Sequence, residues 1–343
     1  MNSKQRVLAA FDHVEPDRVP LWYGAADGLT RRLMQACGVP DEEALMRRLH
    51  IDFRRVRERY IGPPLGSRNV WGVERGGDYY GQPLTHPLAG VETVEQVEAY
   101  AGWPSPVWFD FSHLRAECEQ WADCAIIGGP WVVVFTDATE LVGMAEFFEK
   151  MYTHPEVMGA VVQRVSDFYY QMAVRFFEAV GSRIDIFFFG DDMGTQQALL
   201  ISLKQWREFC KPHIRRFIEL GRQGGYRTMF HSCGAVRPLI PDLIELGLDA
   251  LNPMQVRARG MDLRGLKSDF GARLAFHGGF DHQHVLPFGT PDEVKAEVHR
   301  VIDIMAPGGG YCLAPSHDLM LDEFPAENVV AMYDEAAEYG RYR

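Results

Sequence analysis

Short apolar runs alternate along this chain with longer segments in which apolar residues recur at the helical period. The clearest run, Ile184–Phe189, is followed by a glycine and two carboxylates, as at the end of a buried parallel strand. Runs of this kind predict eight strands, at about 18–23, 51–57, 124–129, 184–190, 226–232, 249–253, 273–277 and 310–315. Strict alternation of strands and helices at that count predicts an α/β fold, a single closed (β/α)8 TIM barrel.

The helices expected between these strands are marked by apolar periodicity and by capping residues. They fall at about 3–13, 28–37, 41–49, 93–101, 110–121, 139–181, 203–223, 237–246, 260–270, 291–305 and 325–340. The first of them precedes the barrel as an N-terminal helical extension. No charged or Ser-rich linker divides the chain, so residues 1–343 are expected to form one domain. No strand is followed by the glycine pattern of a dinucleotide or P-loop site, which argues against a Rossmann fold.

One segment, residues 62–88, interrupts the alternation. It is rich in Gly and Pro and carries the aromatics Trp71, Tyr79 and Tyr80 around a turn-like Gly76-Gly77-Asp78. We interpret it as an inserted hairpin and loop that covers part of the barrel. Its aromatics could wall a substrate site, although packing at the barrel rim is the simpler explanation.

Composition narrows the class of partner. The 35 Lys and Arg against 47 Asp and Glu give a formal charge of −12, which disfavours nucleic acid and leaves a small molecule as the expected substrate. Six scattered cysteines do not form a disulfide pattern, which indicates a reducing, cytoplasmic setting. The N-terminus lacks the apolar core of a signal peptide, and no apolar stretch approaches the ~20 residues of a membrane span.

The candidate chemistry centres on His231 and Cys233 at the end of a predicted strand. Side chains two residues apart on a strand point to the same side, so an imidazole and a thiolate converge there and could hold zinc. A buried cysteine beside a hydrogen-bonded histidine is the alternative. Asp191 and Asp192 end the preceding strand, either facing the same site or capping the next turn.

Several motifs together resemble the uroporphyrinogen decarboxylase superfamily, which also contains zinc- and corrinoid-dependent methyltransferases. They are Gly190-Asp191-Asp192-Met193-Gly194-Thr195-Gln196, His231-Ser232-Cys233-Gly234, Asn252-Pro253-Met254-Gln255, Gly278-Gly279-Phe280-Asp281 and Gly308-Gly309-Gly310-Tyr311. The resemblance implies a single barrel over the whole chain. The decarboxylases carry an Arg-rich loop after the first strand, but here residues 22–28 hold no arginine. Binding of a polycarboxylate porphyrinogen is therefore electrostatically implausible.

The methyltransferase branch implies a zinc site. His231 and Cys233 match its first two ligands, and His317 stands where the family has its third, a cysteine. Cys312 lies five residues earlier, inside the last strand, so its place along the strand favours His317 as the third ligand. In the decarboxylase branch a histidine at this position binds substrate instead. Asp192 or the substrate could complete the zinc coordination.

The expected function is a zinc-dependent methyltransferase. It would move a methyl group between a small substrate, either a methyl ether such as an aromatic one or a thiol, and a corrinoid on a separate partner protein. Asp192 and His317 are the expected catalytic residues, and Tyr23, Asp52 and Gln255 the expected substrate-binding residues. The chain could also form a homodimer.

Two other functions remain open from the sequence. One is a metal-independent decarboxylase or lyase of a smaller acid, with Asp52, placed at the end of the second predicted strand, and His317 as polar catalysts. The other is a barrel without chemistry that serves as a binding subunit. Zinc content separates the first from a methyltransferase, and a Cys233→Ser change separates the second, because a non-catalytic subunit keeps its partner affinity.

Overall fold

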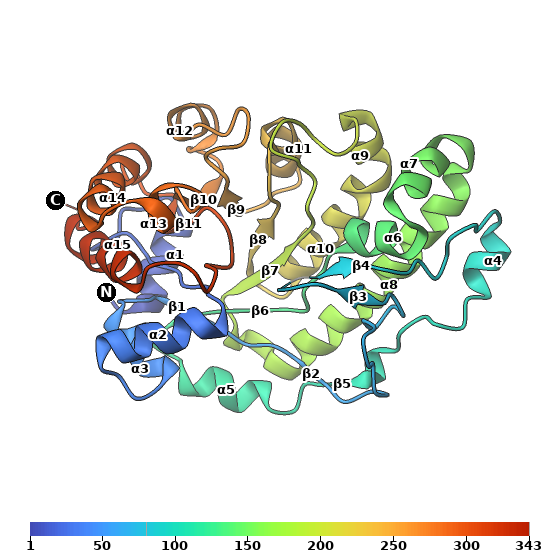
Figure 1. Ribbon diagram of the computed structural model, residues 1–343, viewed down its shortest axis with the longest axis horizontal. Coiled ribbons are helices and arrows are strands. Elements are labelled where there is room, and N and C mark those ends of the chain that lie inside the picture. Colours follow the sequence, from blue (N-terminus) through green and yellow to red (C-terminus); the bar gives the residue numbers. More distant parts are fainter. Residues whose placement is uncertain (80, 343) are drawn as a thin grey trace.

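The computed structural model describes residues 1–79 and 81–342 of the chain. Within this range seven parallel strands form one sheet, in the same order as along the chain. They are β1 (Phe53–Arg55), β6 (Ala125–Gly128), β7 (Ile186–Gly190), β8 (Arg227–His231), β9 (Ala250–Met254), β10 (Ala275–Phe280) and β11 (Tyr311–Pro315). The helices that connect them lie around the sheet, confirming the predicted α/β barrel (Figure 1).

The remaining predicted strand, the first along the chain at 18–23, is an irregular segment that nevertheless closes the barrel. Leu313 N donates to Pro20 O at 2.8 Å and Trp22 N donates to Leu313 O at 3.1 Å, which joins the segment to β11. On its other side, Asp52 N donates to Leu21 O at 2.9 Å, immediately before β1. Pro20 has no N–H to donate, and this explains why the segment makes isolated bridges instead of a regular ladder.

The helices follow the predicted order, with three differences: two predicted helices are divided, and the short helix at 285–288 was not predicted. They are α1 (Ser3–Phe11), α2 (Asp27–Cys37), α3 (Glu42–Arg48), α4 (Val94–Glu98), α5 (Leu114–Gln120), α6 (Val134–Val142), α7 (Met144–Thr153), α8 (Pro155–Val180), α9 (Leu203–Phe209), α10 (Lys211–Gln223), α11 (Ile240–Glu245), α12 (Leu263–Phe270), α13 (Val285–Phe288), α14 (Pro291–Met305) and α15 (Ala326–Tyr339). The prediction of a single helix at 139–181 is wrong. The chain breaks at Gly143, whose φ is +96°, and again before Pro155. The helix predicted at 203–223 also divides, between Phe209 and Lys211.

Helix α1 closes the end of the barrel at which the strands begin. Lys4 N donates to Asp123 O and Gly310 N donates to Ala10 O, at the chain just before β6 and β11. Its apolar face packs into the barrel interior with small and aromatic side chains from the strands. That interior cluster comprises Val7, Ala10, Phe11, Trp22, Phe53, Ala125, Ile127, Ile186, Phe188, Met229, Ala250, Ala275, Cys312 and Ala314. The interior is therefore a packed core, and chemistry is left to the opposite end, where parallel barrels place their sites.

The predicted insertion contains a hairpin of β3 (Arg75–Gly76) and β4 (Gln82–Pro83), which lies beside α6 and α7 (Figure 1). Trp71 is buried and packs edge-on against Phe168 of α8, with ring centroids 5.0 Å apart. Tyr79 is exposed, and Tyr80 lies outside the described residues. The buried aromatic of the insertion thus anchors it to the barrel helices.

Two further short strands, β2 (Arg59–Tyr60) and β5 (Phe109–Asp110), pair antiparallel, which brings the chain just before the insertion beside the chain between α4 and α5. The main hydrophobic core lies outside the barrel, between the sheet and its helices. Each helix in the described part of the chain is too short or too polar to cross a lipid bilayer.

Candidate metal centre

Three side chains that can bind a metal meet where β7 and β8 end. Gly190 and His231 are register partners on these strands, and Asp192 and Cys233 follow them. His231 Nε2 lies 3.5 Å from Cys233 Sγ and 3.4 Å from Asp192 Oδ1. All three ligand atoms lie within 4.8 Å of one another, and no other group of this kind occurs in the described residues.

The cluster has the chemistry and spacing of a zinc site. Zinc takes imidazole nitrogen, thiolate sulfur and carboxylate oxygen in tetrahedral geometry, and bonds of about 2.0–2.3 Å place ligand atoms about 3.3–3.8 Å apart. The two separations measured from His231 Nε2 fall in this range. Three protein ligands also leave a fourth position for substrate, as in catalytic zinc sites. The residues present therefore fit the metal that the sequence predicts.

The charges in the cluster favour an ion pair. Burial raises the pKa of Asp192, but hydrogen bonding and charge attraction to His231 outweigh it and lower the pKa to about 2. Burial lowers the pKa of His231, yet the neighbouring Asp318 and Cys233 raise it well above its usual value. Burial also raises the pKa of the Cys233 thiol, against the opposing influence of His231.

The backbone around Cys233 is held by the loop that follows β7. Cys233 N donates to Asp192 Oδ1 at 2.8 Å, and Ala235 N donates to Thr195 O at 2.8 Å. Gly234 has a φ of +87°, and a Cβ there would lie 2.4 Å from the backbone of Gly194. Only glycine fits this close approach of two loops, which fixes the thiol beside the imidazole.

Gln255, predicted to bind substrate, lies at the same rim as a support of this loop. Its Oε1 accepts hydrogen bonds from Gly234 N and from Gln196 Nε2, both at 2.9 Å. The side chain is buried. Gln255 therefore connects the ends of β7, β8 and β9 directly behind Cys233.

His317 and Asp318 follow β11 at the rim. The ring of His317 stacks on His282, with centroids 5.1 Å apart, and its Nδ1 accepts from Leu319 N at 3.2 Å. His317 is not part of the group of three ligands. Its neighbour Asp318, which the sequence reasoning did not select, places Oδ2 3.4 Å from His231 Nδ1. In the sequence, only its place next to His317 could have pointed to Asp318.

A cavity of about 670 Å³ adjoins the cluster. Its walls include Trp22, Tyr23, Phe53, Trp131, Arg55 and Asp318. The Trp131 ring lies 5.3 Å from the His231 ring, and the Arg55 guanidinium lies 5.2 Å from the same indole. The aromatic walls thus come from the barrel strands and loops. Trp131 and Asp318 line the cavity and also contact His231, but none of the three candidate ligands lines it.

Tyr23 is nearly buried at this cavity. Its hydroxyl lies 2.8 Å from Thr30 Oγ1, and burial raises its pKa. The sequence placed Tyr23 at the substrate site, and the structure brings it to the cavity that adjoins the cluster.

A family model supplies the identification. The model of uroporphyrinogen decarboxylase (URO-D) matches residues 66–339, most of the chain. This chain belongs to the URO-D family.

Individual relatives of this URO-D member divide between two activities. It is 25% identical over 222 residues to the Methylcobamide:CoM methyltransferase MtaA of Methanosarcina barkeri, which covers 63% of this chain and 59% of that protein. It is 22% identical over 222 residues to a uroporphyrinogen decarboxylase of Chlorobaculum tepidum, which covers 62% of this chain and 59% of that protein. The matched region therefore spans less than two thirds of either relative.

Among solved structures, a methyltransferase from Methanosarcina mazei has the same fold. The TM-score is 0.72 at 20% sequence identity, and the match covers 99% of each chain. This likeness over the full length agrees with the barrel derived from the strand order.

Two candidates in this URO-D member lie away from the cluster. Asp52 precedes β1, so the prediction that it ends a strand is wrong. It is fully buried and accepts hydrogen bonds from Arg6 at 2.6 Å and from Arg18 at 2.8 Å. Cys312 is buried in the barrel interior, where burial raises the pKa of its thiol well above the usual value. Neither residue is brought to the candidate ligands.

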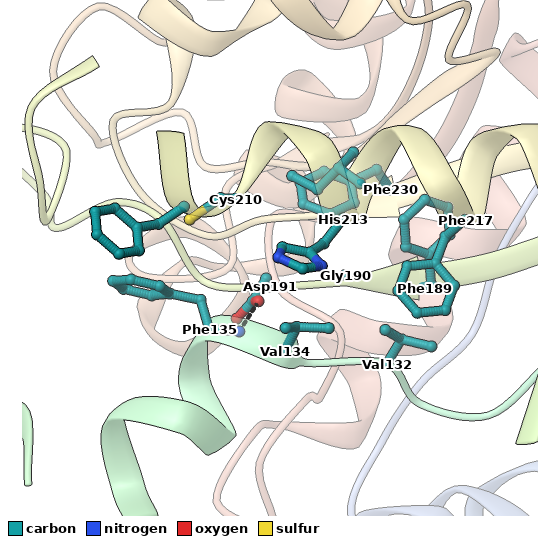
Figure 2. Close-up of a pocket in the computed structure, with 12 residues that line it drawn as sticks. Val132, Val134, Phe135, Phe189, Gly190, Asp191, Cys210, His213, Phe217 and Phe230 are labelled. Carbon is teal, nitrogen blue, oxygen red and sulfur yellow. Dashed lines mark hydrogen bonds between the residues drawn. The ribbon is translucent and has the colours of Figure 1, made fainter. Parts of the chain in front are cut away.

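The two carboxylates after β7 point to different places. Asp191 is buried and accepts hydrogen bonds from the backbone N–H groups of Phe135 and Thr136, at the start of α6. Figure 2 shows it beside Cys210 and His213, at a closed cavity of about 10 Å³ lined mostly by apolar side chains. Burial raises its pKa to about 7 against these hydrogen bonds. Asp191 is therefore a helix cap, and Asp192 alone joins the cluster.

Proposed function

We propose that this chain is a zinc-dependent methyltransferase that moves a methyl group between a small substrate and a corrinoid on a partner protein. The observation that carries the proposal is the cluster of Asp192, His231 and Cys233, with separations that suit tetrahedral zinc. Membership of the URO-D family and similarity to a methylcobamide-dependent methyltransferase support the reaction type.

In this proposal the metal is held by His231 Nε2, Cys233 Sγ and a carboxylate oxygen of Asp192. Zinc would supply Lewis acidity to the oxygen or sulfur atom that loses or gains the methyl group. His317 remains a proposed catalytic residue and a further candidate ligand. Burial and the charge of His231 both lower its pKa, in keeping with a position close to the cluster.

The chain's own residues would then orient the substrate. The cavity beside the cluster has aromatic walls from Trp22, Phe53 and Trp131, which suit a flat ring such as that of an aromatic methyl ether. Tyr23 is proposed to contact the substrate in the same cavity, and Gln255 to act at the rim behind Cys233. A thiol would fit the same position at the open side of the cluster.

The zinc requirement is tested by removing the metal. We expect the purified chain to hold zinc in a one-to-one ratio and to demethylate methylcobalamin in the presence of an acceptor thiol or phenol. Dialysis against EDTA should lower this rate by about a hundredfold or more, because a Lewis acid contributes several kcal/mol to such a step. Zinc added back should restore it. Full activity without zinc would overturn the proposal.

A decarboxylase acting on a smaller acid is the second candidate. It is favoured by the arginines that line the cavity, among them Arg55 and Arg57, which suit a carboxylate. Loss of carbon dioxide from a carboxylic acid that is indifferent to EDTA would select this function. Since the proposed methyl transfer needs the metal, the same dialysis distinguishes the two.

A further inference from the structure

A chain of three buried polar side chains leads away from the candidate ligand His231. His231 ends β8, Asn252 lies on β9 and His277 on β10, so three neighbouring parallel strands each contribute one residue. Their exposed fractions are 5%, 1% and 0%. His231 Nδ1 lies 2.7 Å from Asn252 Oδ1, and Asn252 Nδ2 lies 2.7 Å from His277 Nδ1. Polar groups buried this deeply need their partners, so the chain is a specific arrangement.

The Asn252 amide sets the direction of the hydrogen bonds among these three side chains. Its carbonyl oxygen can only accept a hydrogen bond and its NH2 group can only donate one. With Oδ1 toward His231, the Nδ1 of that ring must carry a proton, so the neutral, metal-binding form of the ring has its lone pair on Nε2, facing Cys233 and Asp192. Asp318 Oδ2 also lies 3.4 Å from His231 Nδ1. A reversed amide would require a bare Nδ1 against this carboxylate, so the Asp318 contact favours the same direction.

His277 holds the other end of the amide. Its ring is enclosed by the edge-on rings of Trp22 and Phe53, with centroids 5.2 and 5.6 Å away. Burial lowers the pKa of His277 to about 4, so the ring is neutral and Nδ1 can accept the proton of Asn252 Nδ2. With its proton on Nε2, the neutral ring supplies the acceptor that the Asn252 NH2 group needs in the direction favoured by Asp318.

We propose that Asn252 and His277 are positioning residues for the metal centre: His277 accepts from the Asn252 amide and holds it in place, and the amide fixes the tautomer in which His231 presents Nε2 to the metal. The inference rests on the proposed function only in requiring that His231 bind a metal. Neither residue is expected to touch the metal or the substrate. Both act through the orientation and basicity of one ligand.

Zinc affinity measured by competition with a chromophoric chelator tests this inference. Asn252→Leu has a similar shape but neither hydrogen bond, and we expect it to bind zinc about tenfold to a hundredfold more weakly. His277→Phe should weaken binding by about tenfold, because the buried Asn252 NH2 group then loses its partner and the amide is held less firmly. His277→Gln, which can still accept from Asn252 Nδ2, should recover most of the affinity.

Asn328→Leu is the matched control. Asn328 is equally buried, and its Nδ2 donates to Leu286 O and Gly289 O, between α13 and α15 and outside the cluster. This variant should lose stability and keep its zinc affinity. Wild-type zinc affinity in Asn252→Leu, or an equal loss in Asn328→Leu, would overturn the inference.

A second readout observes the tautomer directly. In the zinc-loaded chain labelled with ¹⁵N-histidine, long-range ¹H–¹⁵N correlations should place the His231 proton on Nδ1, and a proton on Nε2 would contradict the inference. Failure of the proposed reaction can be told apart from failure of the positioning. If the wild-type chain binds zinc but transfers no methyl group, the reaction is wrong while the affinities still test the positioning. If it binds no zinc, the metal centre itself is wrong.

Discussion

Cys233→Ser should abolish zinc binding and methyl transfer while the fold persists. The thiol lies 3.5 Å from His231 Nε2, and its backbone N–H donates to Asp192, so Cys233 contacts both other members of the cluster. A serine hydroxyl is a poor ligand for zinc beside imidazole and carboxylate. Loss of a hydrogen bond that supports a ligand lowers metal affinity by about tenfold to a hundredfold, and we expect loss of the ligand itself to lower zinc affinity further. Metal analysis and the methylcobalamin assay measure the two effects.

Cys37→Ser is the matched control for this change, because Cys37 is partly exposed at the end of α2 and outside the cluster. It should retain wild-type zinc content and rate. If Cys233→Ser kept both as well, the thiol would not be a ligand. Loss of turnover in Cys233→Ser with unchanged zinc content would also contradict the proposed role.

Asp52→Ala should destabilise the protein strongly without acting on the metal centre directly. The carboxylate is fully buried and pairs with Arg6 and Arg18, so its removal leaves two largely buried guanidinium groups without this partner. Breaking a buried ion pair from one side costs about 3–5 kcal/mol. We expect the free energy of unfolding, measured by urea denaturation, to fall by about this amount. Zinc binding at low temperature should be unchanged.

Asp17→Ala is the comparison for Asp52. Asp17 also pairs with Arg6, but its side chain is 42% exposed, and such pairs contribute about 0–1 kcal/mol. A small effect at Asp17 and a large one at Asp52 would support a structural role for the buried carboxylate. Wild-type stability in Asp52→Ala combined with a raised KM would instead restore the substrate-binding role predicted from the sequence.

Most of the barrel could be predicted because its strands are short apolar runs between periodic helices. Seven of the eight predicted strands are present in the described residues. The other, at 18–23, is an irregular segment because Pro20 cannot donate a hydrogen bond to a ladder. The helix predicted at 139–181 failed for a local reason. The apolar period continues through Gly143, but the positive φ at that residue ends the first helix, and the chain breaks again at His154, before Pro155.

The candidate site was predictable only where it depends on one strand at a time. The pair His231 and Cys233 follows from the two-residue repeat of a strand, and Asp192 from its place after β7. The contacts of Asn252 and Asp318 with His231 depend on how different strands lie beside one another, which no local pattern specifies. Asp52 was misplaced because the predicted strand 51–57 runs past both ends of β1, and the carboxylate lies before that strand instead of at its end.

Anomalous scattering at the zinc absorption edge tests the metal centre most directly. We expect one strong peak in crystals grown with equimolar zinc, bonded to His231 Nε2 and Cys233 Sγ at about 2.0–2.3 Å and to Asp192 or His317 at a similar distance. Absence of a peak there, or a peak bonded to neither His231 nor Cys233, would contradict the proposed zinc site and the methyltransferase mechanism built on it.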